Sequence, residues 1–421
     1  MSLPQGKMNH IMNHSAKVIH KQTVSVRELA SLIGKMTASM AAVVPAPLQC
    51  RFLQMAKTKA LINQNSYEAK VTLTSGCKEE LQWWIEHLRD NNGKTLITPF
   101  PDMTIESDAS LMGWGATCQG KRTGGAWSSA EKSMHINALE LTAAFLAIKT
   151  FTKGKTNIHV HLKMDNRAAV AHVIRMGGTK SPTLVNLSKE MWQYSLAHKI
   201  YLTAEYLPGV NNVIADWESR HVTDSSDWQL DPQIFKLINK QMGNLEVDLF
   251  ASRINHQLEK YISWRPDPGA MATDALQISW GHMKGYAFPP FTLIARCLSK
   301  IRKEQSTIVM ITPTWHTQPW FPLIMEMSID FPILLPTFKG LLISPLQQVH
   351  PLLETGSLQL AAWRVSGNHL LQMEFQKKLP NLCHTHGVTE HQALITPPGE
   401  NGVVGVVNNK LIHFRPLWAI S

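Results

Sequence analysis

The chain has 421 residues, of which 44% are hydrophobic and 17% charged, so it is long enough for two or three domains with buried cores and is not typical of a disordered protein. No apolar run approaches the roughly 20 residues of a membrane span, residues 1–20 lack an apolar signal core, and the five widely spaced cysteines favour a reducing compartment. These features predict an intracellular protein without a membrane partner, in cytoplasm or nucleus, and the net charge of +10 favours a polyanionic partner such as nucleic acid.

Residues 1–95 are predicted to be mainly helical. Apolar residues from Leu29 to Met36 recur at helical spacing, and a later helix contains the pair Trp83 and Trp84. Two interpretations of the tryptophans remain open. They form either a stacking platform for nucleic acid or, more often in proteins, a packing contact between domains.

Residues 96–225 alternate between strands and helices. The residue pattern predicts strands at 103–108, 113–119, 122–127, 157–164 and 201–206. It predicts helices at 135–151, 167–176, 182–197 and 213–220. Gln119-Gly120-Lys121 is expected to form a hairpin turn. This order of elements predicts an α/β fold with a five-stranded mixed sheet and flanking helices.

The remaining residues are predicted to hold a second α/β domain. Residues 226–243 are expected to form a connector with one short helix, and residues 244–350 the second α/β domain. Residues 351–421 are expected to form a weakly structured C-terminal tail, in which residues 358–365 are predicted as one more strand. The tail is rich in Gly, Asn and His after Pro380. The whole chain is therefore expected to comprise a helical region, two α/β domains and a tail.

Four acidic residues stand at comparable places in residues 96–225. Asp108 and Asp165 end predicted strands, Glu140 lies in an otherwise apolar helix, and Asp216 follows the last strand. Each acid alone is more often solvated surface than a ligand. Together they would suit a pair of divalent cations, which activate water and stabilise the leaving oxygen in phosphodiester hydrolysis. Such clustered like charges are costly without metal.

These acids fall within four ordered motifs. The motifs are Ser107-Asp108-Ala109-Ser110, His135-Ile136-Asn137-Ala138-Leu139-Glu140-Leu141, Met164-Asp165-Asn166 and Ala215-Asp216-x-x-Ser219-Arg220. In order and spacing, residues 102–220 resemble the ribonuclease H domain of reverse transcriptases. The resemblance implies two-metal hydrolysis of the RNA strand in RNA–DNA hybrids, with two Mg2+ ions, for which Mn2+ can substitute.

The resemblance also implies a role for each acid. Asp108 would bridge both ions, Asp216 would help to hold the ion that activates water, and Glu140 and Asp165 would hold the ion near the leaving 3′-oxygen. Two features depart from the family. The loop 207–212 lacks the histidine that many members carry, and the loop 177–181 is short where cellular members have a basic one. Both departures imply weak hybrid binding by this domain in isolation.

The flanking regions extend the resemblance. Residues 25–90 loosely resemble the thumb and connection that follow a polymerase palm, and the order of domains resembles the DIRS-type retrotransposon polyprotein. Polymerase palm and fingers from a longer polyprotein are therefore implied partners. The chain has no paired-Asp polymerase motif, so polymerase activity is not expected.

The second α/β domain resembles phage-type adenine-N6 methyltransferases through its Asp248 segment and Phe288-Pro289-Pro290-Phe291. Phe288 replaces the polar residue that would bind the target amine. We therefore expect a degenerate, inactive domain. A Pro-Pro turn between core aromatics is the alternative interpretation.

The sequence thus predicts a ribonuclease H, an RNA–DNA hybrid endonuclease, within a fragment of a retroelement reverse transcriptase polyprotein. One alternative is a catalytically silent nucleic-acid-binding module. A second is a DNA adenine-N6 methyltransferase with a structural ribonuclease H domain. The predicted partners are RNA–DNA hybrid and other nucleic acid, and the oligomeric state is left open.

Overall fold

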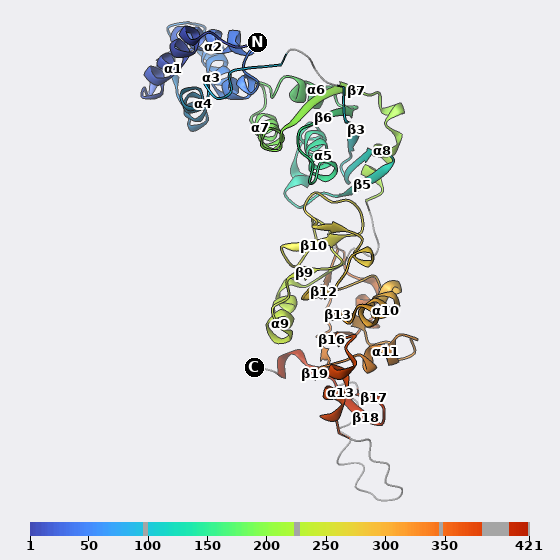
Figure 1. Ribbon diagram of the computed structural model, residues 1–421. Helices are drawn as coiled ribbons and strands as arrows, with labels where there is room; N and C mark the ends of the chain where they lie inside the picture. The colour runs from blue at the N-terminus through green and yellow to red at the C-terminus, as the bar shows by residue number, and fades with distance from the viewer. Residues whose placement is uncertain (96–99, 223–227, 345–347, 381–403, 420–421) are drawn as a thin grey trace, which may run out of the picture. The chain divides into compact units, whose positions relative to one another are not determined.

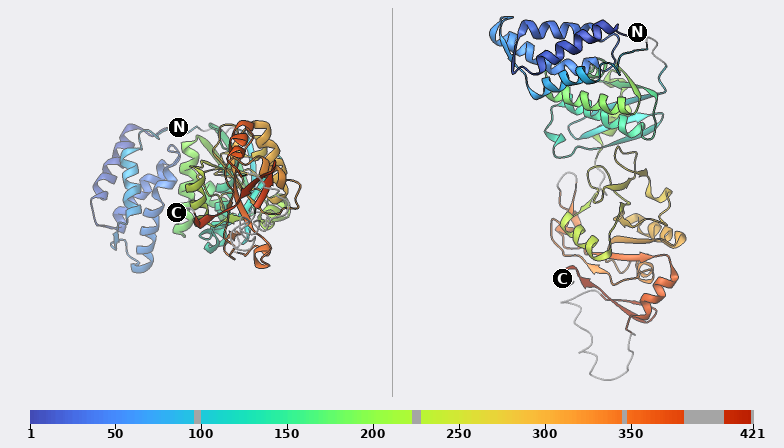
Figure 2. Two further views of the ribbon diagram at one scale, coloured as in Figure 1. Left: turned by 90° about the horizontal axis from the view of Figure 1, so that it is seen from below. Right: turned by 60° about the vertical axis from the view of Figure 1, so that its left-hand side comes forward.

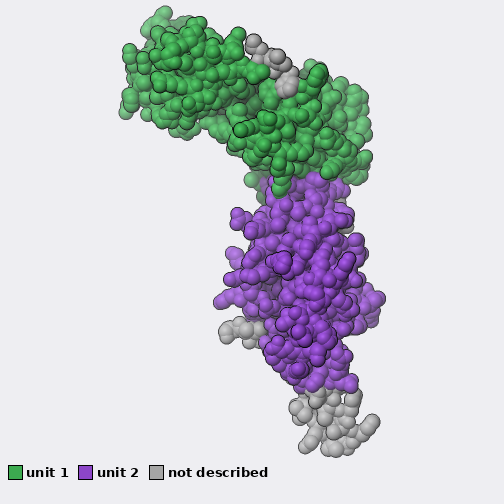
Figure 3. Space-filling model, in the orientation of Figure 1, with its two compact units in different colours: residues 1–125, 129–222 green, residues 126–128, 223–421 purple. Residues whose placement is uncertain are grey.

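A computed structural model describes residues 1–95, 100–222, 228–344, 348–380 and 404–419. The chain divides into two compact units, drawn in different colours in Figure 3. Unit 1 comprises residues 1–125 and 129–222, and unit 2 comprises residues 126–128 and 223–421. The finer division predicted from the sequence stays a prediction, because two of its boundaries fall at the undescribed residues 96–99 and 223–227. Within the described ranges, no helix combines the length and apolarity needed to cross a bilayer.

Residues 1–95 form a small helical core, as predicted. The helices are α1 (Gln5–Ile19), α2 (Val26–Ser39), α3 (Arg51–Gln64) and α4 (Ser75–Glu86), and the short strands are β1 (Thr23–Ser25) and β2 (Lys70–Thr72). The four helices lie side by side, coloured blue in Figure 2. Trp84 is fully buried among them, and its indole N–H donates to the carbonyl of Gln49 at 2.7 Å. Trp84 is therefore a packing residue, and its partners lie inside this helical region.

The rest of unit 1 is built on a five-stranded mixed sheet with flanking helices, which confirms the predicted α/β fold (Figure 1). Its order is β5-β4-β3-β6-β7. The strands are β3 (Met103–Ala109), β4 (Gly113–Cys118), β5 (Lys121–Ala126), β6 (Ile158–Met164) and β7 (Ile200–Tyr206). Gln119 and Gly120 turn the chain between β4 and β5 with φ of 49° and 78°, the left-handed values that a two-residue hairpin turn needs.

Four helices cover this sheet. They are α5 (Ile136–Phe151), α6 (Arg167–Ile174), α7 (Pro182–Ala197) and α8 (Val213–Arg220). Helix α5 is buried almost all round, because it packs between the sheet strands β3 and β4 and the helices α6 and α7. Helices α6 and α7 begin where side chains cap their first turns. The Asn166 oxygen accepts from Ala169 N–H, and the Ser181 hydroxyl accepts from Leu184 N–H.

Strand direction decides where the acidic residues meet. Strands β3, β6 and β7 pair in parallel, so their carboxyl ends lie at one edge of the sheet. Asp108 is the penultimate residue of β3, Asp165 directly follows β6, and Tyr206 ends β7. Asp108 and Asp165 therefore lie at the same edge of the sheet. The segment that leaves this edge after β7 leads to α8, which carries Asp216.

Unit 2 contains an eight-stranded sheet in the order β11-β10-β9-β12-β13-β16-β14-β19, so the second α/β fold is also confirmed. These strands are β9 (Val247–Asp248), β10 (Lys260–Ser263), β11 (Ala272–Thr273), β12 (Gly285–Ala287), β13 (Thr307–Pro313), β14 (Ile333–Leu334), β16 (Leu360–Ser366) and β19 (Arg415–Pro416). Strands β9 to β13 are parallel, and β16 pairs antiparallel with β13 and β14. The likeness of this unit to methyltransferases stays a prediction.

Further elements complete unit 2. Its helices are α9 (Pro232–Met242), α10 (Ile294–Glu304), α11 (Phe321–Glu326), α12 (Pro351–Glu354) and α13 (His369–Lys377). Its other strands are β8 (Gln229–Leu230), β15 (Leu342–Ile343), β17 (Val404–Val407) and β18 (Lys410–His413).

Two segments outside the predicted second domain belong to this fold. Within the predicted connector 226–243, α9 places four apolar side chains in the core of unit 2, as its helical period allows. Within the predicted tail, residues 360–366 agree with the strand predicted at residues 358–365. They form β16, a strand inside the sheet, and Trp363 is fully buried. The predicted poorly ordered stretch 381–403 lies outside the described residues.

Candidate active site

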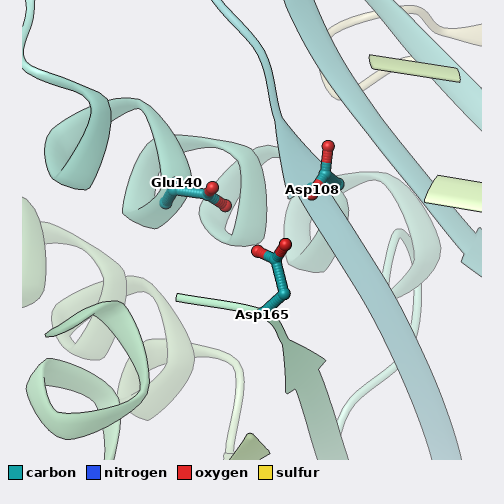
Figure 4. Close-up of side chains that lie close together, drawn as sticks. All are labelled: Asp108, Glu140 and Asp165. Carbon is teal, nitrogen blue, oxygen red and sulfur yellow. The ribbon is translucent and has the colours of Figure 1, made fainter. Parts of the chain in front are cut away.

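Three of the four predicted acids converge at the carboxyl edge of the unit 1 sheet. They come from β3 (Asp108), α5 (Glu140) and the residue after β6 (Asp165). One carboxylate oxygen from each lies within 4.8 Å of the others, and Figure 4 shows the three side chains pointing toward a common point. Elements far apart in sequence thus supply one compact acidic group.

Burial and mutual repulsion make this group costly to ionise. Asp108 is 3% and Glu140 5% exposed. Burial, followed by the charges of Asp108 and Asp165, raises the pKa of Glu140 to about 9. Burial also raises the pKa of Asp108 to about 6, with the neighbouring carboxylates adding to the shift. The pKa of Asp165 is raised too, by burial and by Asp216.

The oxygens at this site fit a divalent cation. The Oε2 atom of Glu140 is buried and has no hydrogen-bond partner. A buried carboxylate oxygen without a donor is unusual, because leaving it unpaired costs free energy. A cation bound among these three carboxylates would satisfy that oxygen and offset the repulsion. Oxygen ligands of this kind are those that Mg2+ prefers.

Asp216 lies beside the group of three but outside it. Its carboxylate accepts from Nε of Arg220 at 2.7 Å, one helical turn later on α8. Its charge still raises the pKa of Asp108 and Asp165, so it is close enough to act on both electrostatically. The structure therefore places Asp216 outside the group of three, near Asp108 and Asp165 and paired with a cation of its own helix.

Helix α8 also holds Asp108 in position. The buried hydroxyl of Ser219 donates to Oδ2 of Asp108 at 2.6 Å. This bond requires α8 to lie directly on β4, and Gly115 makes that approach possible. A Cβ atom at Gly115 would lie 2.2 Å from the carbonyl oxygen of Ala215 and 2.5 Å from the N of Ser219. A larger residue at position 115 would displace α8 and both of its site residues.

Three asparagines near the site were not predicted as functional residues. The Asn166 side-chain N–H donates to Asn137 Oδ1 at 3.0 Å, which links the start of α6 to the first turn of α5 beside Glu140. Asn212 is fully buried and donates to the carbonyl of Ser107, next to Asp108. Their positions in the sequence are the feature that indicates a role, because each asparagine lies within four residues of a predicted acid.

The predicted residues of unit 2 do not form a comparable group. Asp248 ends β9 and is 2% exposed, but both carboxylate oxygens accept backbone N–H groups, from Phe250 at 3.3 Å and Gln257 at 3.0 Å. Phe288 packs against the core of the unit, with its ring centroid 6.4 Å from that of Phe291. Among the described residues, the three-carboxylate group of unit 1 is the only cluster of three or more acidic, His or Cys residues with metal-site spacing.

The sequence matches no family model and no curated protein. Solved structures do match parts of the chain. The N-terminal RNase H domain of Rv2228c from Mycobacterium tuberculosis, solved as a fusion with maltose binding protein, is 16% identical, with a TM-score of 0.25 over 28% of this chain and 91% of that one. LC11-RNase H1 in complex with an RNA/DNA hybrid is 15% identical, with a TM-score of 0.26 over 28% of this chain and 93% of that one.

The foamy viral protease-reverse transcriptase dRH in complex with double-stranded DNA also matches. It is 12% identical, with a TM-score of 0.21 over 48% of this chain and 35% of that one. At these identities and TM-scores, the likenesses assign no activity to the chain. The case for a function rests on the site itself.

Proposed function

We propose that residues 96–225 are a divalent-metal-dependent ribonuclease H that cleaves the RNA strand of RNA–DNA hybrids. The observation that carries the proposal is the convergence of Asp108, Glu140 and Asp165 from three separate elements, with the buried Oε2 of Glu140 left without a partner. The net charge of +10 further supports a nucleic-acid partner.

The chain's own residues would hold and orient the metal ligands. Ser219 fixes the Asp108 carboxylate through its hydroxyl, and Arg220 fixes Asp216 on α8. Asp108, Glu140 and Asp165 would hold Mg2+, and Asp216, which lies beside the group, would help to hold it. Bound divalent ions supply a water of lowered pKa and stabilise the charge that develops on the leaving oxygen. Asp165 and Asp216 are partly exposed, so a phosphate group can reach the site from solvent.

The direct test is cleavage of an end-labelled RNA–DNA hybrid by the full chain in Mg2+, with EDTA as the metal-free condition. We expect cuts within the RNA strand in Mg2+ or Mn2+ and none in EDTA. Calorimetric titration with Mg2+ provides a second readout, in which the Glu140→Gln variant should bind the ion more weakly. Hybrid binding without metal-dependent cleavage would instead support the silent nucleic-acid-binding alternative.

We further propose that unit 2 does not transfer methyl groups. Both oxygens of Asp248 are engaged by its own loop, and Phe288 supplies no hydrogen-bond acceptor for a target amine. A desolvated amine without an acceptor would cost about 1–3 kcal/mol. Titration with S-adenosylmethionine and a methyl-transfer assay on single- and double-stranded DNA test this role. Micromolar binding with turnover would contradict it.

The retroelement context is a proposal as well. The order of a helical region, a ribonuclease H-like sheet and a second α/β unit supports a fragment of a DIRS-type reverse transcriptase polyprotein. In that setting, palm and fingers domains of the same polyprotein would supply the polymerase active site. Coexpression with a polymerase segment, followed by co-purification, would test the association.

A further inference from the structure

Exposed apolar side chains gather around the candidate active site. Among the described residues 100–222, nine large apolar side chains are exposed, and six of them lie on segments that leave the carboxylate edge of the sheet. We call these six residues the apolar rim: Leu111, Met112, Tyr206, Val210, Val213 and Trp217. Single exposed apolar residues are ordinary on a protein surface, but a cluster beside a candidate site indicates a contact surface.

Contacts on the backbone tie the rim to the acidic group. Leu111 and Met112 occupy the turn after β3, and the Ser110 hydroxyl in that turn donates to the carbonyl of Ser219 on α8 at 2.6 Å. Tyr206 pairs with Met164, the residue before Asp165. Gly209, which precedes Val210, lies so close to Asp165 that a Cβ there would be 3.2 Å from Oδ2. Each part of the rim is thus within a few residues of a metal-ligand candidate.

Trp217 is the largest member and is held in a defined orientation. It directly follows Asp216, and its side chain is 46% exposed. Its ring stacks on His221, with centroids 4.4 Å apart and planes at 12°, while Nδ1 of His221 contacts the Trp217 carbonyl at 2.8 Å. Val213, one turn earlier on α8, is 63% exposed. An indole already fixed by a neighbour loses little entropy when a ligand packs against it.

Cations accompany the aromatic residues of the rim. The Arg167 guanidinium lies 4.2 Å from the ring centroid of Tyr206, and the Arg220 side chain is 62% exposed one turn after Asp216. Aromatic faces interspersed with arginines are typical of surfaces that bind sugar–phosphate chains, where rings contact bases or riboses and cations contact phosphates. RNA-containing duplexes present such ribose and base edges in a wide, shallow minor groove.

Resting on the proposed function, we infer that the apolar rim is the surface on which the hybrid lies, with Trp217 packing against sugar and base edges next to the cleaved phosphate. The apolar rim can contact the sugars and base edges of the hybrid, whereas the charged carboxylates make no apolar contact. It also offsets the repulsion between the carboxylates and the nucleic-acid backbone.

The test measures hybrid affinity by fluorescence anisotropy, using the full chain with Asp108→Asn to prevent cleavage. Adding Trp217→Ala should weaken binding about tenfold, the scale expected when a large apolar side chain that is partly buried on binding is removed. Trp217→Phe should restore most of the affinity. Trp264→Ala is the matched control, because Trp264 is a 64% exposed tryptophan of unit 2, and it should leave affinity unchanged. Raising the salt concentration should weaken all variants while preserving the Trp217→Ala ratio, because the lost contact is apolar.

The outcomes separate this inference from the proposed function. Cleavage by the wild-type chain, together with equal hybrid affinity for Trp217→Ala and its parent, would overturn the rim alone. Absence of wild-type cleavage, with binding that still depends on Trp217, would overturn the nuclease and leave the rim standing. A change in oligomeric state on Trp217→Ala, with unchanged hybrid affinity, would show a protein interface instead and so overturn the inference.

Discussion

Asp108 in unit 1 and Asp248 in unit 2 occupy similar places and have different surroundings. Both lie at the carboxyl end of a strand inside a sheet, and both are at most 3% exposed. Burial raises both pKa values, to about 6 for Asp108 and about 7 for Asp248. Burial and a raised pKa therefore do not distinguish a candidate catalytic acid from a structural one.

The partners of the two carboxylates do distinguish them. Asp248 accepts two backbone N–H groups from the loop that follows it, so its charge supports local structure. Asp108 faces two other carboxylates and has one hydroxyl donor, Ser219. Repulsion between carboxylates that exceeds what neighbouring donors offset indicates a site suited to an external cation, whereas satisfied hydrogen bonds indicate a fold-stabilising residue.

The largest expected effect is on catalysis at Asp108. Asp108→Asn should lower the rate of hybrid cleavage by roughly a hundredfold or more, because metal-ion catalysis supplies several kcal/mol of charge stabilisation. The melting temperature should stay level or rise, since the variant removes repulsion and keeps the side-chain volume. Single-turnover cleavage and thermal unfolding measure the two effects.

The matched control is Glu106→Gln, two residues earlier on the same strand and outside the acidic group. It should cleave at close to the wild-type rate. Wild-type cleavage by purified Asp108→Asn would refute the assignment of the active site.

Asp248→Ala should act on stability alone. Two part-buried N–H groups lose their acceptor, so the free energy of unfolding should fall by about 2 kcal/mol. Asp248→Asn, which keeps one acceptor oxygen, should lose less. Urea unfolding gives the stability change. The rate of hybrid cleavage, measured below the unfolding transition, should be unaffected. A lower cleavage rate in the folded variant would show that Asp248, like Asp108, acts in catalysis.

Ser219→Ala should produce a smaller catalytic loss. The variant removes the hydroxyl that donates to Asp108 and should lower metal affinity or activity about tenfold, the lower end for losing a residue that orients a metal ligand. Higher Mg2+ should recover part of the activity. Ser195→Ala is the control, since Ser195 is also fully buried in a helix but donates to the carbonyl of Met191. Equal Mg2+ dependence in the two variants would argue against a positioning role.

The smallest expected effect is a difference in pH dependence. The folded-state pKa values of Asp108 and Asp248 lie above the unperturbed value of 3.8, so the folded chain binds these protons more tightly than the unfolded chain. The free energy of unfolding should therefore fall as pH rises from about 4 to about 7. Mg2+ should reduce the Asp108 contribution, because a cation favours the ionised carboxylate, and should leave the Asp248 contribution in place.

Melting curves at several pH values, in EDTA and in Mg2+, provide the comparison. In EDTA, Asp108→Asn and Asp248→Asn should each flatten the fall in stability. An Mg2+ effect of equal size in wild type and Asp108→Asn would contradict the metal site.

Local sequence determined most of the unit 1 sheet. Alternation, helical period and capping residues are properties of short segments, so the helix Pro182–Ala197 was predicted at its observed bounds and the strand Met103–Ala109 within one residue. The turn at Gln119 and Gly120 was also readable, because left-handed backbone favours such residues. The identity of the four acids came from motif order, which the chain carries without its fold.

Tertiary structure alone decided how these residues meet. The unpaired Oε2 of Glu140, the Ser219 bond to Asp108 and the pairing of Asp216 with Arg220 depend on which strands and helices become neighbours. In unit 2, strands of two residues such as β9 are too short for a periodic signal, and the place of β16 between β13 and β14 depends on pairing between distant segments. Short segments determine local conformation, whereas long-range pairing determines which buried charge finds a partner and which one needs a cation.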